Sequence, residues 1–256
     1  MFETLINQTK ILEQLGGMWI IALLVFSRSL AFASTAPLIG NKTLPALVKI
    51  SFAMLLTLIL IPNIETPTEY PQGFKFIYLI VTNVFVGMLI GWVSGLVIGI
   101  GRAAGEMLDM QMALNAATLF DPGSQTQTTI IGKFFDFLAL VLFISIGGME
   151  KVIEGLYKSF TTFPVIIYQI NFNFEKLLKA TSDVIAISFL IVSPIIVIVL
   201  AVDLILGLMS RAAPQINAFQ ISFSIKPSIS LLILIILLPA LLQVLARLYI
   251  NPMRFF

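Results

Sequence analysis

Long apolar runs separated by short polar breaks dominate the sequence. Six of these runs reach or approach the roughly 20 residues that a helix needs to cross a hydrocarbon core. They cover residues 17–36, 44–62, 76–100, 130–148, 184–209 and 228–250. Because backbone in lipid must satisfy its own hydrogen bonds, each run predicts a helix. Turn-forming residues mark the breaks, among them Pro37, Asp121-Pro122-Gly123 and Pro214.

The pattern predicts an all-α fold, a membrane-type helical bundle of about six apolar segments in a single domain covering residues 1–256. Some segments are expected to be bent, because Pro194 and Pro239 lie inside two runs and each removes a backbone donor. We predict that the first run is a membrane helix and not a cleaved signal peptide, because Arg28 interrupts it and no basic segment precedes it. The connector 149–183 carries charges at helical spacing, which is typical of amphipathic turns at a water interface.

Composition strengthens the membrane interpretation. Hydrophobic residues make up 59% of the chain and charged residues 11%, whereas soluble domains carry about 25% charged residues. We therefore expect most of the exterior to face lipid or other apolar protein. The net charge is only +2 and the basic residues are scattered, so a nucleic-acid partner is not expected. Lys and Arg are spread nearly equally over the two predicted sides, so loop charge assigns no orientation.

The residue inventory argues against an enzyme. The chain has no cysteine and no histidine, which excludes thiolate and imidazole metal ligands, Cys nucleophiles and every triad that needs a histidine. The glycines around position 101 do not have the G-x-G-x-x-G spacing and follow no predicted strand, so they do not indicate a nucleotide-binding loop. We expect no catalytic residues, no cofactor and no metal site.

Four glycines recur at a spacing of four residues in the third apolar run. They are Gly87, Gly91, Gly95 and Gly99. On a helix they share one face and form a smooth groove, which lets another backbone approach closely. The pattern predicts a helix-packing surface, although glycine is also common in membrane helices and a chance arrangement stays open.

Charged residues follow directly after this run. Arg102 and Glu106 lie four residues apart and can pair on one helical face, which Asp109 extends. At the edge of an apolar span, such a group predicts a structural ion pair. Three methionines lie close to it: Met107, Met110 and Met112. Methionine repacks easily, which suits a seal that opens and closes, but it also serves as ordinary core filler.

Two further aspartates lie in apolar surroundings. Asp203 is inside the fifth run, and Asp136 is near the start of the fourth. Such carboxylates serve either in ion or proton pathways or in ion pairs within the bundle. We favour structural pairing, because no chain of further carboxylates accompanies either residue. Arg28 and Arg247, which also lie inside apolar runs, are available partners.

Four short motifs occur in order along the chain. They are Ala36-Pro37-Leu38-Ile39-Gly40 with Pro45, then Gly105-Glu106-Met107 with Met110-Gln111-Met112, then Ala117-Thr118-Leu119-Phe120-Asp121-Pro122, and finally Leu206-Gly207-Leu208-Met209-Ser210-Arg211-Ala212-Ala213-Pro214-Gln215-Ile216-Asn217. Together they resemble the FliR/SctT family, the export-gate subunits of bacterial flagellar and virulence type III secretion systems. Each motif alone is weak, but the ordered set, from about residue 15 to residue 245, is specific.

The resemblance implies a core subunit of a protein-conducting gate in the bacterial inner membrane, at the flagellar basal body or the base of a secretion system. FliP-like and FliQ-like subunits, and an FlhB-like subunit, are the implied partners in a helical multi-subunit complex. Unfolded exported proteins would pass through its centre. Some apolar segments are then expected to be hairpin-like and to pack on other subunits as much as on lipid.

The resemblance also implies a plug loop that helps to keep the channel shut. The matching positions here are residues 110–123. The gate residues that the resemblance indicates are Met110, Gln111, Met112, Phe120, Asp121, Pro122 and Gly123. The chain departs from the family at Asn115-Ala116, where many relatives have Ser-Phe, so we assign the seal to the methionines and Phe120.

A protein of a different class is the alternative. The chain could be a secondary transporter or channel subunit for a small solute or ion, with Asp203 and Arg102 near a substrate path and Pro194 breaking a helix. Partner dependence distinguishes the two functions. A transporter is expected to purify alone and bind a solute, whereas a gate subunit is expected to be unstable or inactive without its neighbours.

Overall fold

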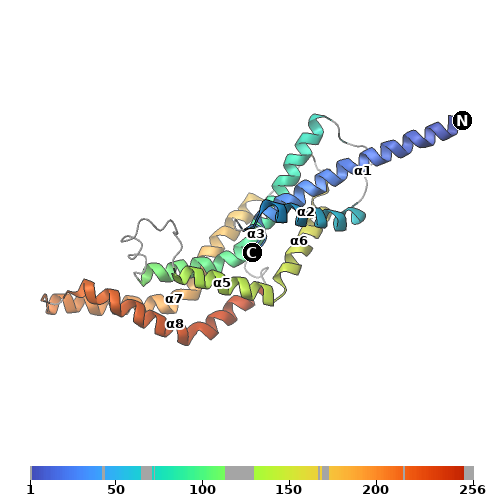
Figure 1. Ribbon diagram of the computed structural model, residues 1–256. Helices are drawn as coiled ribbons and strands as arrows, with labels where there is room; N and C mark the ends of the chain where they lie inside the picture. Colours follow the sequence, from blue (N-terminus) through green and yellow to red (C-terminus); the bar gives the residue numbers. More distant parts are fainter. Residues whose placement is uncertain are drawn as a thin grey trace. The chain divides into compact units, whose positions relative to one another are not determined.

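A computed structural model describes residues 2–41, 44–64, 71, 73–112, 130–166, 168, 173–215 and 217–250, and only the backbone for 2–16, 218 and 248–250. Its elements are shown in Figure 1. In order they are α1 (Phe2–Thr35), α2 (Ala46–Leu60), the 3-10 helix η1 (Ile61–Asn63), α3 (Phe74–Gln111), α5 (Ile130–Ser145), α6 (Gly148–Thr162), α7 (Phe174–Ala212) and α8 (Ala218–Ile250). Every regular element in these ranges is helical, which confirms the predicted all-α fold.

The predicted number of apolar segments is also confirmed. Within the described residues, five helices are long and apolar enough to cross a membrane, and α5 with α6 forms a sixth crossing if this bent pair is one span. The bend lies at Ile146-Gly147, where Gly147 has a φ of 71° and its N–H bonds to the Ile144 carbonyl at 3.0 Å. Glycine adopts this left-handed conformation without the steric cost that a Cβ imposes, so α5 ends there.

Four helices, α1, α3, α7 and α8, are longer than their apolar runs. The third run predicts a helix over 76–100, whereas α3 has 38 residues and continues to Gln111. At 1.5 Å per residue it extends over roughly 57 Å, well beyond a hydrocarbon core of about 30 Å. The connector 149–183 is in part helical, since it contains most of α6 and the start of α7. Asn173 caps α7, where its Oδ1 accepts a bond from the Lys176 N–H at 3.2 Å.

The chain divides into two compact units. Unit 1 comprises residues 1–95 and 149–172, and unit 2 comprises residues 96–148 and 173–256, so the boundary falls within α3. In unit 1, α1 packs against α2 and against the first part of α3. Its core consists of buried apolar side chains, among them Leu24, Phe32, Leu56, Leu79 and Leu156.

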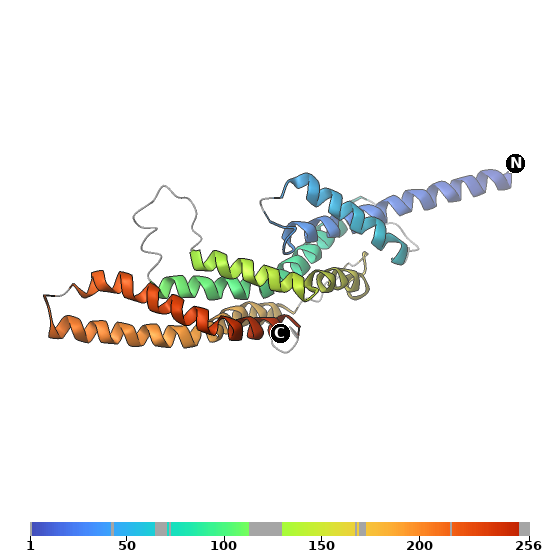
Figure 2. The ribbon, with the colours of Figure 1, turned by 60° about the horizontal axis from the view of Figure 1, so that its bottom comes forward.

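Unit 2 is built from two helical hairpins. Figure 2 shows α7 beside α8, in orange and red, and the end of α3 beside α5, in green. The hydroxyl of Ser188 on α7 lies 2.9 Å from the Ile100 carbonyl of α3, which ties the two hairpins together. The buried core includes Leu108, Phe135, Ile195 and Leu245. The hairpins bring residues far apart in sequence into contact, and they position the site described next.

Candidate functional site at the end of α3

Two glycines let the end of α3 approach α5 closely. A Cβ placed on Gly101 would lie 2.6 Å from the Cβ of Ala139, and one placed on Gly105 would lie 2.8 Å from the Cα of Gly132. Contacts this short exclude a larger side chain unless the helices separate. The pair was missed as a packing motif in the sequence, although its spacing of four residues is the same signal that singled out the earlier glycines.

The earlier glycines divide into two pairs. A Cβ on Gly87 would collide with the Arg28 carbonyl, and one on Gly91 would collide with the Thr35 hydroxyl, so both lie directly against α1. Nothing that the structure describes lies within 4 Å of a Cβ placed on Gly95 or Gly99. The first pair therefore packs inside the chain, while the second pair is open to a further helix.

Asp109 is fully buried and binds the first turn of α5. Its Oδ2 accepts a bond from the Gly132 N–H at 2.6 Å, and its Oδ1 accepts one from the Ile131 N–H at 3.3 Å. These are N–H groups at the start of α5 that have no acceptor within their own helix. The negative charge also lies at the positive end of the α5 dipole. A hydrogen bond to a charged group contributes about 1.5–3 kcal/mol, so Asp109 is a strong tie between the two helices.

Arg102 makes a second tie, with a partner that the sequence did not indicate. Its guanidinium binds both carboxylate oxygens of Asp136 on α5, with Nη2 at 2.8 Å and 3.0 Å and Nε at 3.0 Å from Oδ1. Glu106, the expected partner, is exposed to solvent. Arg102 directly follows Gly101, which packs on α5, and its side chain reaches Asp136 on that helix. Its side chain is 56% exposed and that of Asp136 is 33% exposed, so the pair contributes less than a buried one.

The predicted gate residues lie only partly within the described residues. Met110 is 69% exposed, Gln111 is partly exposed, and Met112 is fully buried. The Met112 N–H bonds to the Leu108 carbonyl at 2.8 Å, which continues the helical pattern one residue beyond α3. Phe120, Asp121, Pro122 and Gly123 lie outside the described residues. The structure thus places two methionines of opposite exposure directly after Asp109.

Asp203 also forms an ion pair. Its carboxylate contacts the ammonium group of Lys226, which joins α7 to α8 within their hairpin. Neither Arg28 nor Arg247 is the partner of Asp203 or Asp136, although both had appeared available. Lys226 lies near the start of α8 and Asp203 near the end of α7, so the hairpin brings the two to the same level. Asp136 and Asp203 thus each form an ion pair with a residue of a neighbouring helix.

Arg28 has buried partners that the sequence did not indicate. It is fully buried in α1, and its guanidinium donates to oxygens on other segments of unit 1. Nε lies 2.9 Å from the Asn83 Oδ1, and Nη1 lies 3.1 Å from the Ser159 carbonyl. Nη2 lies 3.5 Å from the Pro164 carbonyl. These acceptors are all neutral, and the carbonyls lie at the end of α6, where a helix dipole favours a cation. An arginine within an apolar run is the signal for such a site.

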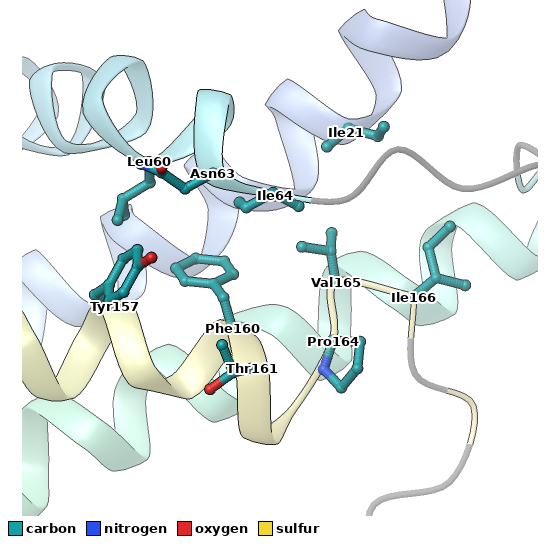
Figure 3. Close-up of a pocket in the computed structure, with 10 residues that line it drawn as sticks. All are labelled: Ile21, Leu60, Asn63, Ile64, Tyr157, Phe160, Thr161, Pro164, Val165 and Ile166. Carbon is teal, nitrogen blue, oxygen red and sulfur yellow. The ribbon is translucent and has the colours of Figure 1, made fainter.

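A cavity of about 580 Å³ lies next to Arg28 in unit 1. Figure 3 shows its lining: Ile21, Leu60, Asn63, Ile64, Tyr157, Phe160, Thr161, Pro164, Val165 and Ile166. The ring of Phe160 lines this cavity and also faces the Arg28 guanidinium, whose carbon lies 4.3 Å from the ring centroid. These lining residues are uncharged. Elsewhere in the described part of the chain, no group of three or more His, Cys, Asp or Glu residues is placed to hold a metal ion.

Comparison with known proteins identifies the family. Residues 19–251 match the family described as "Bacterial export proteins, family 1". The chain is 29% identical to the flagellar biosynthetic protein FliR of Bacillus subtilis, over 89% of each chain. It is 31% identical to FliR of Escherichia coli, over 83% of this chain and 82% of that protein. It is 29% identical to the surface presentation of antigens protein SpaR of Shigella flexneri, over 64% of each.

These matches confirm the resemblance read from the four motifs. They also confirm the prediction that the chain is not an enzyme, because the family consists of export proteins. The matched region includes all of the apolar helices from α2 to α8 and most of the apolar part of α1. The chain therefore belongs to family 1 of the bacterial export proteins, as a membrane-type homologue of FliR and SpaR.

Proposed function

We propose that this chain is a core subunit of the export gate of a flagellar or virulence type III secretion system, in the bacterial inner membrane. It assembles with FliP-like and FliQ-like subunits, beside an FlhB-like subunit, into a channel for unfolded substrates. Family membership supports this proposal. The uncovered apolar helices support it as well, because between 22% and 50% of each candidate span is buried by the described chain itself.

The observation that carries the gate function is the structure of the α3–α5 hairpin. Close glycine contacts and the Asp109 bonds hold its end, and two methionines follow immediately. Met112 is fully buried while Met110 is exposed, so in this proposal Met112 anchors the segment and Met110 is available to seal a passage. In this proposal residues 110–123 are the plug.

The test replaces Met110 and Met112 together by glycine in the assembled complex. We expect membranes that contain the variant complex to leak small ions, because glycine removes both the exposed Met110 side chain that would fill the constriction and the buried Met112 side chain that would anchor the segment. Conductance across the membrane is the measurement. The matched control replaces both residues by leucine, which keeps apolar bulk and is expected to stay closed. Unchanged conductance of the fully assembled glycine variant would contradict the gate function.

A small-solute transporter is the second candidate, and two observations weigh against it. Arg102 and Asp203, the residues assigned to its substrate path, are each engaged in an ion pair between neighbouring helices. A substrate group would have to displace Asp136 or Lys226 to reach them. The gate function does not require either ion pair to be broken.

A further inference from the structure

We propose that Asp109 is a positioning residue of the closed gate. Its carboxylate holds the first turn of α5 against the last turn of α3, and it thereby fixes the resting positions of Met110 and Met112. This inference rests on the proposed function, because a resting position has a measurable consequence only if the methionines contribute to a seal.

The location of Asp109 in the hairpin carries the first part of the argument. A helix usually satisfies its initial N–H groups with the side chain of its own N-cap residue. Here the acceptor of two N–H groups of α5 comes from a different helix, 22 and 23 residues earlier in the chain. The Asp109 side chain is fully buried by the described residues. One side chain thus ties the start of α5 to the end of α3.

The neighbouring contacts show why loss of the Asp109 carboxylate would release only the end of the hairpin. The other ties between α3 and α5 described above lie earlier along α3, at Gly105 one turn before Asp109 and at Gly101 and Arg102 two turns before it. Without Asp109 the hairpin keeps these contacts and loses the bonds at its end. The last turn, which carries Met112, is then released while the remainder stays packed.

The first measurement is amide hydrogen exchange in the assembled complex. In Asp109→Ala the Ile131 and Gly132 amides are expected to exchange about 10- to 100-fold faster, because two buried donors lose a charged acceptor. Asp109→Asn is expected to show a smaller increase, since its single amide oxygen replaces one of the two acceptors. The control is Glu106→Gln, the same chemical change at an exposed position, and it is expected to leave both amides protected.

The second measurement is ion leak through the same complexes. We expect the leak to rise in the order wild type, Asp109→Asn and Asp109→Ala, with Glu106→Gln equal to wild type. A role in overall folding alone would not produce graded leak in complexes of normal composition. Asp109→Asn keeps the comparison informative if Asp109→Ala fails to assemble, because it preserves side-chain shape.

The outcomes separate this inference from the proposed function. If the Met110 and Met112 glycine variant leaks while the Asp109 variants stay closed, Asp109 does not position the gate and the inference is overturned. Unaltered exchange of Ile131 and Gly132 in Asp109→Ala would overturn it as well. If the methionine variant stays closed but exchange accelerates in Asp109→Ala, the gate function is wrong, and with it the positioning role.

Discussion

At the residue scale, the two buried charged side chains Arg28 and Asp109 are each stabilised by specific partners. Arg28 binds an amide oxygen, two carbonyl oxygens and an aromatic ring, whereas Asp109 binds two backbone N–H groups. In both cases a helix end contributes, the C-terminus of α6 for the cation and the N-terminus of α5 for the anion. A charge inside an apolar segment can therefore be retained without an oppositely charged side chain.

Arg28→Met is expected to destabilise unit 1. The variant keeps an unbranched apolar side chain but leaves the Asn83 Oδ1 without the donor that the guanidinium supplies, at a cost of about 3 kcal/mol in free energy of unfolding. Thermal unfolding of the purified complex measures the effect. Arg247→Met, a change at an exposed arginine, is the control and is expected to unfold near the wild-type temperature. Equal unfolding temperatures for the two variants would refute the role of Arg28.

At the element scale, α3 uses glycine in two different ways. Gly87, Gly91, Gly101 and Gly105 each lie against another helix of the chain, whereas a Cβ on Gly95 or Gly99 would have no described atom within 4 Å. The contacts of the first group explain why α1 and α5 can pack so closely on this helix. The open pair retains the predicted role of packing against a partner helix, which stays a prediction.

Gly105→Leu and Gly95→Leu are expected to distinguish a glycine that packs inside the chain from one that is predicted to pack against a partner helix. Leucine at position 105 meets the Gly132 backbone and the Phe135 side chain, so the hairpin of α3 and α5 should open and become sensitive to limited proteolysis. A Cβ at position 95 has no described atom within 4 Å, so we expect the fold to be retained with leucine there. We expect Gly95→Leu instead to reduce co-purification with partner subunits. Normal assembly of Gly95→Leu would show that this glycine is not a subunit contact.

At the scale of the whole molecule, the apolar surface exceeds what the chain itself can cover. The spans of α2 and α8 are 22% buried, and those of α3 and α7 are 33% buried. Many large apolar side chains of α7 are exposed, among them Leu190, Val197, Leu204 and Leu208. Lipid or other subunits must cover such extended apolar surface. The length of α3 and α7 favours other subunits for the parts that exceed the hydrocarbon core.

We expect the yield of stable protein to depend on co-expression with the partner subunits. Produced alone in detergent, the chain should aggregate or be degraded, because its apolar faces have no protein partner. Produced with FliP-like and FliQ-like subunits, it should elute as a defined complex in size-exclusion chromatography. A monodisperse chain that purifies alone and binds a small solute would support the transporter alternative.

Hydropathy and motif order predicted the helices and the family because both are local properties of the chain. The apolar run 76–100 identified α3, and the motif from Leu206 to Asn217 contributed to the family resemblance that the comparisons confirm. The partners of individual side chains could not be predicted in this way. Arg102 was expected to pair within its own helix, and the glycines that contact α5 were not recognised as a packing pair.

Residue order was enough to predict the all-α fold, the membrane character, the number of apolar segments and the family. The helix packing was needed to show that Asp109 binds the start of α5, that Arg102 binds Asp136 and that Arg28 binds the end of α6. The physical reason is sequence separation, since these bonds join residues from 22 to 136 positions apart. Residue spacing within one helix shows which side chains share a face, but the packing of helices determines which other helix that face meets.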